Sequence, residues 1–125
     1  MRATPWIVLG AVFLSLGCGP PAVAPATSGA RAHVGVRLYT TRWCPHCERA
    51  RHWLRARGIP YQELDVETSA VAAAQHRQLD PHRTVPVITV EGGGVMVGFV
   101  PDELRRRIDL AAHARCRERP DAAGC

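Results

Sequence analysis

The sequence predicts an α/β fold in which a mixed sheet of four strands is flanked by three helices, in the order β-α-β-α-β-β-α. Apolar runs of strand length alternate with longer amphipathic segments in the first part of the chain, which is the pattern of crossover units with parallel strands. A run of glycines then separates the last two apolar runs and indicates a hairpin, which adds an antiparallel strand. A final amphipathic segment completes the order.

The first crossover unit consists of a strand over residues 36–41, a helix over 48–57 and a strand over 61–67. The first strand is short and apolar, which indicates that it is buried. Apolar residues recur on one stripe of the helix, and a Gly and a Pro end it. The second strand alternates, with Leu64 and Val66 facing inward. Because a helix connects the two strands, they are predicted to be parallel.

The second helix is predicted to end at Leu79, and either Thr68 or Ser69 caps its N-terminus. Its alanines and Val71 supply a modest apolar face. An Asp-Pro pair stops the helix, and the next strand covers residues 84–90 with a proline near its start, where a missing N–H is tolerated.

A glycine-rich turn over residues 91–94 leads into a short strand over 95–97. The last helix begins around residues 101–103, where a Pro is followed by two acidic residues that suit the positive end of the helix dipole. Its apolar stripe consists of Leu104, Ile108 and Ala112.

Charge excludes one class of partner. The chain has 16 basic residues, all of them arginine, and a formal net charge of +5. They are spread over the chain without the basic arm or interleaved aromatic residues that nucleic-acid binders use, so no nucleic acid is expected as a partner. An anionic lipid surface or an acidic protein surface suits this charge better.

The ends of the chain are predicted to lie outside the folded domain, which covers residues 34–114. Residues 1–18 combine Arg2 with an apolar run and a small-residue ending, the pattern of a secretion signal. Residues 19–33 are rich in Pro, Ala, Gly and Ser and indicate a tether that cannot bury enough surface to fold. Residues 115–125 form a polar tail with two cysteines.

The signal ends in Leu-Ser-Leu-Gly-Cys18, which resembles the lipobox of bacterial lipoproteins, where the Cys becomes the lipidated first residue. The resemblance implies an exported protein, lipid-anchored in the bacterial cell envelope and facing the periplasm or the outside. Ser15 stands where such signals usually carry an aliphatic residue. Cleavage by the ordinary signal peptidase and an uncleaved N-terminal anchor therefore remain open as alternatives.

Cys44 and Cys47 predict a redox dithiol. They follow a strand and enter a helix, so the first sulfur lies at the helix N-terminus, where unpaired N–H groups and the dipole stabilise a thiolate. Pro45 suits the first helical position. Cys44 is therefore expected to attack a disulfide, and Cys47, one turn later, to resolve the resulting mixed disulfide.

Residues beside the dithiol can tune its chemistry, and the same pair of cysteines has rival uses. His46 and Arg42 flank the thiols and as cations would favour the thiolate, although His46 could equally be a solvent-facing helix residue. A zinc site lacks further ligands at regular spacing, covalent haem needs a His where Glu48 stands, and a structural disulfide across so short a loop would stabilise little. The rival from another class is a non-catalytic envelope protein that holds Cu(I) or Zn(II) with the same pair.

Three motifs together resemble the thioredoxin superfamily and, within it, glutaredoxins and the glutaredoxin-like electron donors of ribonucleotide reductase. They are C-P-H-C at residues 44–47, Thr-Val-Pro at 84–86 and Gly-Phe-Val-Pro-Asp at 98–102. The similarity covers about residues 36–108. It implies a thioredoxin-like fold of the glutaredoxin type.

The resemblance also implies site residues. Pro86 would follow a cis peptide bond and face the dithiol, which leaves the backbone of Val85 free to pair with a bound substrate. The substrate-binding residues implied in this way, with those beside the dithiol, are Arg42, Trp43, Thr84, Val85, Pro86, Gly98 and Phe99.

The implied function is thiol-disulfide exchange between the dithiol and disulfides of proteins or small molecules, supported by an upstream thiol reductant or oxidant. The protein would act as a monomer and need no metal or organic cofactor. Two departures from glutaredoxins disfavour glutathione as a co-substrate. Thr41 stands where glutaredoxins carry a Lys, and the motif at 98–102 is closer to donors linked to thioredoxin reductase. The direction of exchange stays open.

Cys116 and Cys125 lie in the polar tail. In an exported chain they would pair as a disulfide, which leaves Cys44 and Cys47 for chemistry and Cys18 for lipid. Two free thiols, or a shuttle that relays electrons to Cys44, are the alternatives.

Overall fold

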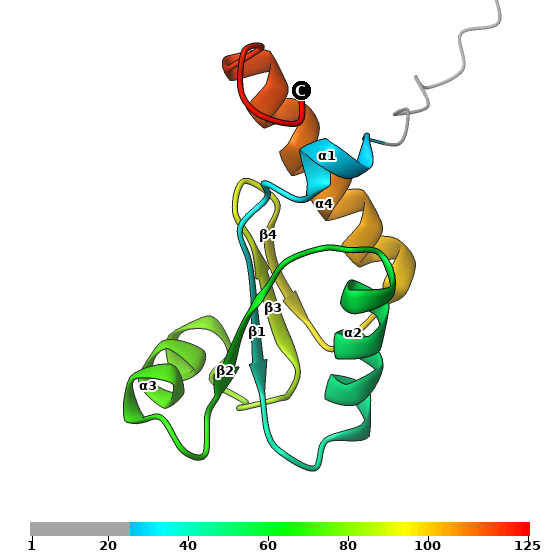
Figure 1. The fold of residues 1–125 in the computed structure, drawn as a ribbon. Coiled ribbons are helices and arrows are strands. Elements are labelled where there is room, and N and C mark those ends of the chain that lie inside the picture. Colours follow the sequence, from blue (N-terminus) through cyan, green and yellow to red (C-terminus); the bar gives the residue numbers. More distant parts are fainter. Residues whose placement is uncertain (1–25) are drawn as a thin grey trace, which may run out of the picture.

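The structure is a computed structural model, and it describes residues 26–125 of the chain (Figure 1). The signal predicted over residues 1–18, with Cys18 at its end, and the first part of the predicted tether lie outside the described residues. Among the helices of residues 26–125, none is long and apolar enough to cross a lipid bilayer. In chain order the elements are α1 (Ser28–Arg31), β1 (Val36–Thr40), α2 (Pro45–Ala56), β2 (Gln62–Asp65), α3 (Ala70–Leu79), β3 (Val87–Val90), β4 (Gly94–Val97) and α4 (Pro101–Glu118).

The strands form one mixed sheet in the order β2-β1-β3-β4, which confirms the predicted fold class. Strand β1 lies inside the sheet, parallel to β2 and antiparallel to β3, and β3 continues into β4 through an antiparallel hairpin. Leu38 in β1 pairs with Glu63 of β2 on one side and with Ile88 of β3 on the other. The end of β1, which leads into the dithiol, is therefore held by neighbours on both edges.

Helices α2 and α4 cover one face of the sheet, and α3 covers the other (Figure 1). The main core lies beneath α2 and α4. Leu54 of α2 and Leu104 of α4 are both 0% exposed, and they belong to one cluster with Leu38, Ile88 and Ile108. The apolar stripes predicted for these two helices are the faces that they bury.

Helix α3 buries a different face from the predicted one. Its N-cap is Ser69, whose hydroxyl accepts a hydrogen bond from the backbone N–H of Ala72 at 3.2 Å. Val71, which was predicted to supply the apolar face, is 68% exposed, whereas Ala72 and His76 are buried. Alanines lie around most of this helix, so their spacing does not indicate which face is buried. The hydrogen bond of His76 to the Thr84 backbone instead fixes the face that packs on the sheet.

The folded domain begins earlier than predicted, because part of the tether predicted over residues 19–33 is packed helix. Thr27 caps α1 by accepting a hydrogen bond from the backbone N–H of Ala30 at 3.2 Å. Ala30 is buried in the core cluster, and Arg31 Nε donates to Asp109 Oδ1 of α4 at 2.6 Å. The small side chains that suggested a tether instead let α1 pack closely on α4.

The C-terminal segment also belongs to the fold. Helix α4 continues past the predicted end of the domain to Glu118, and a disulfide joins Cys116 to Cys125. The loop that this disulfide closes lies against α1, where Thr27 Oγ1 donates to the Gly124 carbonyl oxygen at 3.2 Å. Both ends of the described chain therefore meet at the end of the molecule opposite the turn between β1 and α2 (Figure 1).

Candidate active site

Cys44 is the N-cap of α2 and lies between the end of β1 and Pro45. Its backbone is extended, with φ −87° and ψ 114°, and its sulfur accepts a hydrogen bond from the backbone N–H of Cys47 at 3.2 Å. A capping side chain satisfies one of the N–H groups that the first helical turn leaves unpaired, and here the acceptor is a sulfur. The Cys44 sulfur therefore lies at the positive end of the helix dipole, where an anionic acceptor makes a stronger hydrogen bond than a neutral one.

Cys47 lies one turn into α2 and is 0% exposed, whereas Cys44 is half-buried, and both are free cysteines. Burial raises the pKa of the Cys47 thiol to about 12, and the hydrogen bond to Cys44 adds to the rise. Cys47 therefore keeps its proton at neutral pH, and Cys44 is the sulfur that a substrate reaches first. This geometry supports the predicted division of roles between attack and resolution.

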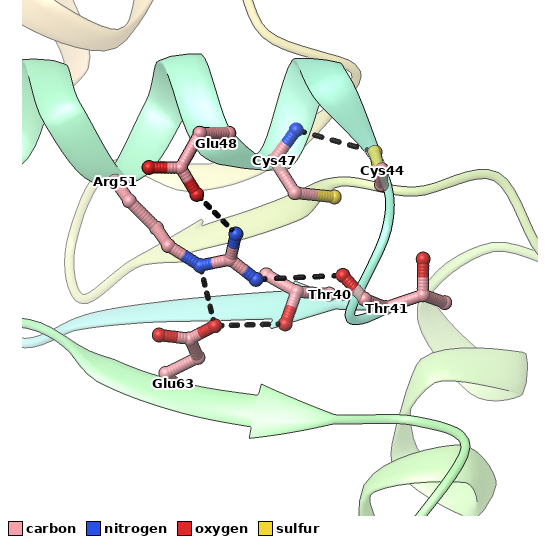
Figure 2. Close-up of polar contacts among 7 residues, drawn as sticks. All are labelled: Thr40, Thr41, Cys44, Cys47, Glu48, Arg51 and Glu63. Carbon is pink, nitrogen blue, oxygen red and sulfur yellow. Dashed lines mark hydrogen bonds and ion pairs between the residues drawn. The ribbon is translucent and has the colours of Figure 1, made fainter.

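A cation that the sequence analysis missed lies one turn beyond Cys47. The Arg51 guanidinium donates to Glu63 Oε1 of β2 at 2.6 Å and to Glu48 Oε2 of α2 at 2.8 Å (Figure 2). Its Nη2 lies 3.4 Å from the carbonyl oxygen of Thr41. Burial alone would lower the pKa of Arg51, but the hydrogen bonds to the two carboxylates outweigh it and raise the pKa, so the guanidinium stays charged.

The loop before β3 lies opposite Cys44. The peptide bond between Val85 and Pro86 is cis, the conformation that the resemblance implied, and the Cys44 thiol faces the carbonyl oxygen of Val85 at 3.7 Å. Gly98, whose φ of 85° suits a glycine, donates its N–H to the carbonyl oxygen of Pro86 at 2.8 Å. The three motifs that carry the resemblance therefore meet at one place.

Two residues that were not predicted hold the backbone of Thr84. Asp80 accepts hydrogen bonds from the backbone N–H groups of Thr84 at 2.7 Å and His82 at 3.0 Å. His76 Nε2 donates to the Thr84 carbonyl oxygen at 2.7 Å. Because both backbone groups of Thr84 bond here rather than to a neighbouring strand, β3 begins at Val87 and not at residue 84 as predicted.

Replacing Asp80 with asparagine is expected to flatten the dependence of stability on pH at acid pH. Desolvation alone would raise the pKa of Asp80, but the backbone N–H groups of Thr84 and His82 outweigh it and hold the pKa below its usual value. A lowered carboxyl pKa stabilises the fold above the unfolded-state pKa, and this contribution is lost as pH falls through the folded-state pKa.

Urea unfolding at a series of pH values checks this expectation. Below about pH 4, the ordinary pKa of an Asp, the natural chain should lose stability more steeply than Asp80→Asn. The matched control is Asp121→Asn in the exposed C-terminal segment, which should follow the natural chain. Identical acid limbs for Asp80→Asn and the natural chain would contradict the role of Asp80.

Three of the predicted site residues lie exposed around Cys44, namely Arg42, Trp43 and His46. Trp43 is 79% exposed, which leaves its ring available to a partner. The ring Nδ1 of His46 lies 2.6 Å from Arg49 Nη2. Because a guanidinium can only donate, the His46 ring accepts in this contact, which gives no support to the predicted tuning of Cys44 by His46.

Phe99, predicted to contact substrate, packs largely on the core. Its ring lies edge-on to Trp53 of α2, with the ring centroids 6.3 Å apart. The remaining surface of Phe99 lines an open cavity of about 420 Å³ along α2, together with Trp53 and His52. Gly98, the residue before it, is the part of this motif that contacts the loop opposite the dithiol.

Within residues 26–125, no group of three or more His, Cys, Asp or Glu side chains is placed to bind a metal ion. Cys44 and Cys47 would supply two ligands. A four-coordinate ion such as Zn(II) would therefore need its remaining ligands from another molecule or from outside this part of the chain.

Comparison with known proteins relates the chain to glutaredoxins, and residues 36–95 match the family model described as Glutaredoxin. The chain is 34% identical over 67 residues to a glutaredoxin of Pseudomonas aeruginosa, covering 54% of this chain and 77% of that protein. It is 27% identical over 74 residues to an uncharacterized glutaredoxin-like 8.6 kDa protein in the rubredoxin operon of Clostridium pasteurianum. This match covers 59% of this chain and 97% of that protein. The fold also matches a solved structure of the glutaredoxin-like NrdH-redoxin from Escherichia coli, which is described as having a thioredoxin-like activity profile. The TM-score is 0.51 at 26% identity, and the match covers 58% of this chain and 92% of that chain.

Proposed function

The chain belongs to the glutaredoxin family of thiol-disulfide oxidoreductases, and we propose that it moves electron pairs between its dithiol and the disulfides of proteins or small molecules. The observation that carries the proposal is the place of the Cys44 sulfur. It caps α2, accepts the N–H of Cys47 at 3.2 Å and faces the carbonyl oxygen of Val85. A nucleophilic sulfur is thus presented beside a loop on which an extended substrate can lie.

The exchange proceeds in two balanced steps. The Cys44 thiolate attacks one sulfur of the substrate disulfide, a bond forms between these sulfurs, and the other substrate sulfur leaves as a thiolate that takes a proton from water. Cys47 then gives its proton to water and attacks Cys44, so that the Cys44–Cys47 disulfide forms and the second substrate sulfur leaves as a thiolate, which also takes a proton from water. Two electrons pass to the substrate, and an upstream thiol reductant restores the dithiol. The same steps in reverse oxidise a substrate dithiol.

Export to the bacterial cell envelope is part of the proposal. It is supported by the signal-like residues 1–18 with Cys18 at their end, and by the disulfide between Cys116 and Cys125, because such bonds persist in oxidising compartments. Fractionation of the producing bacterium tests it. The natural chain should sediment with membranes and carry a lipid that Cys18→Ser lacks. A natural chain in the cytosolic fraction would overturn this part.

A protein dithiol is proposed as the reductant in preference to glutathione. Glutaredoxins carry a Lys at the position that corresponds to residue 41, where it holds the glutathione carboxylate, whereas this chain has the neutral Thr41. The similarity to NrdH-redoxin, with its thioredoxin-like activity profile, points the same way.

Reduction of insulin disulfides by the full chain tests the function and the reductant together. NADPH oxidation should be rapid when thioredoxin reductase regenerates the dithiol, and slow when glutathione with glutathione reductase does so. A higher rate with the glutathione system would overturn the choice of reductant. No reduction with either system, or with a chemical dithiol, would overturn the function itself.

A further inference from the structure

A charged side chain occupies a place between helix and sheet where an apolar one would be expected. The Arg51 side chain is only 11% exposed, yet it points from α2 toward β2 rather than into solvent (Figure 2). Burying a charge costs several kcal/mol unless partners compensate it, and replacing such a pair by apolar residues is often neutral for stability. Stability alone therefore does not account for a cation at this position.

The guanidinium is held from three sides. Glu63 and Glu48 accept from it at 2.6 Å and 2.8 Å, and the Thr41 carbonyl oxygen lies 3.4 Å from Nη2. Glu63 Oε1 also accepts from Thr40 Oγ1 at 3.1 Å, which ties the carboxylate to the end of β1. Hydrogen bonds to β2, to its own helix and to the residue that follows β1 thus leave the guanidinium little freedom to rotate.

This anchored cation lies beside the resolving sulfur. Arg51 follows Cys47 by four residues, so the two side chains share one face of α2. Figure 2 shows the guanidinium and the Cys47 sulfur in the same layer between the helix and the strands. The Cys47 sulfur also has a hydrogen bond to the backbone of Thr41, the residue whose carbonyl oxygen Arg51 contacts.

Cys44 acts differently on the Cys47 thiol in the two halves of the exchange. Burial raises the pKa of Cys47 most, Cys44 raises it further, and the Thr41 backbone and the Arg51 charge lower it. Once Cys44 is joined to a substrate sulfur it is neither a thiol nor a thiolate. The Thr41 backbone and the Arg51 charge are then the groups that favour deprotonation of Cys47, whereas burial opposes it.

We propose that Arg51 is a positioning residue for the second step, in which its charge, aimed by Glu48 and Glu63, stabilises the Cys47 thiolate as that thiolate attacks the mixed disulfide. The proposal rests on the proposed function. The charged or titratable groups that act on Cys47 are Cys44 and Arg51, both on α2, and the carboxylates of Glu48 on α2 and Glu63 on β2 pair with Arg51. The loop before β3 contributes neutral residues, with the Val85 carbonyl oxygen facing Cys44. Glu48 and Glu63, with side chains 67% and 35% exposed, are screened more strongly by solvent than Arg51.

The expected effect of removing the charge follows from the thiolate fraction. Loss of a neighbouring cation raises a thiol pKa, and a rise of about one unit cuts the thiolate fraction about tenfold. A more basic thiolate is also a better nucleophile, with a Brønsted slope of about 0.4–0.5, which recovers about threefold. Arg51→Met should therefore slow resolution at neutral pH about threefold to fourfold.

The experiment isolates the second step. A mixed disulfide between Cys44 and a small chromophoric thiol is formed on the full chain at low pH, and release of the thiol is followed by stopped flow after a jump to each of several higher pH values. Arg51→Met should slow release, and Arg51→Lys, which keeps a cation, should restore most of the rate. The matched control is Arg55→Met, an exposed arginine one turn further along α2, which should behave as the natural chain.

Two further measurements separate a charge effect from misfolding and from failure of the function. Cleavage of the same mixed disulfide by an external thiol should be unchanged in Arg51→Met, because Cys44 is untouched. If Arg51→Met does not fold, Arg51→Gln, which can still hydrogen-bond, replaces it. Unchanged release in the neutral variants, equal slowing by Arg55→Met, or no restoration by Arg51→Lys would overturn the role of Arg51. Failure of the natural chain to form the mixed disulfide at Cys44 would instead overturn the proposed function.

Discussion

Cys44→Ser is expected to abolish disulfide reduction by this protein, leaving only the background rate of the assay mixture. A hydroxyl cannot form the mixed disulfide, and Cys47 cannot replace Cys44 because it is 0% exposed and its pKa is raised to about 12. Insulin reduction with a chemical dithiol as electron source measures the loss. The side chains differ by one atom, so the fold should be retained.

Two companion variants make this result specific. Cys47→Ser should accumulate the mixed disulfide at Cys44, which intact mass spectrometry detects as the added mass of the bound thiol. A double variant with serine at Cys116 and Cys125 should keep its activity, because their disulfide lies at the far end of the molecule. Retained activity in Cys44→Ser, or a mixed disulfide trapped on Cys47 instead, would contradict the assignment.

Leu104→Ala is expected to lower the free energy of unfolding by about 3–4 kcal/mol, the largest effect on stability that we predict. Leu104 lies in the first turns of α4, is 0% exposed and belongs to the cluster between α4 and the sheet. Removing its side chain loses apolar burial and leaves a cavity that close-packed neighbours fill only in part. Urea unfolding followed by circular dichroism measures the change.

The same helix provides the control for this substitution. Leu110 also lies on α4, but its side chain is 52% exposed. Leu110→Ala makes the identical chemical change with the same loss of side-chain atoms, and it should cost less than about 1 kcal/mol. Equal losses for the two variants would mean that helix propensity rather than core packing controls the stability of α4.

The parts of the site that were predictable depend on neighbours in sequence. A cysteine one residue before a proline at a helix start is placed by local rules alone, so the positions of Cys44, Pro45 and Cys47 follow from the sequence. The parallel pairing of β1 with β2 and the antiparallel hairpin of β3 and β4 followed from the same kind of argument, because a helix between two strands makes them parallel and a short glycine-rich turn makes them antiparallel. The pairing of β1 with β3, which completes the sheet order, was not predicted.

The parts that were missed depend on contacts between elements. Glu63 pairs with Leu38 across two strands, and paired positions point to the same face, so its carboxylate lies on the side of the sheet that α2 covers. Strand β2 is at the edge of the sheet, which leaves that position close enough to solvent for a charge. The signal for this ion pair was that a charged residue, Glu63, pairs with a core leucine, Leu38, and so needs a partner of opposite charge such as Arg51.

Polar residues at the end of α3 show the same limit. Asp80 and His76 bond to the backbone of Thr84, and backbone groups carry no mark in the sequence. Helix α1 was missed for a different reason. Its buried residue is alanine, and composition treats alanine with proline and glycine as a sign of a tether, although a small side chain is what close packing on α4 requires.

Helix α1 and the C-terminal segment lie together at the end of the molecule opposite the turn between β1 and α2, where Cys44 caps α2 (Figure 1). Attachment of the protein to a resin, a sensor chip or a bilayer through the segment before α1 or through the C-terminal segment will therefore leave its reactive sulfur facing away from that surface. In a chain shortened to residues 26–125, a short peptide could therefore join the two ends, and new ends could be opened in an exposed loop, as circular permutation requires.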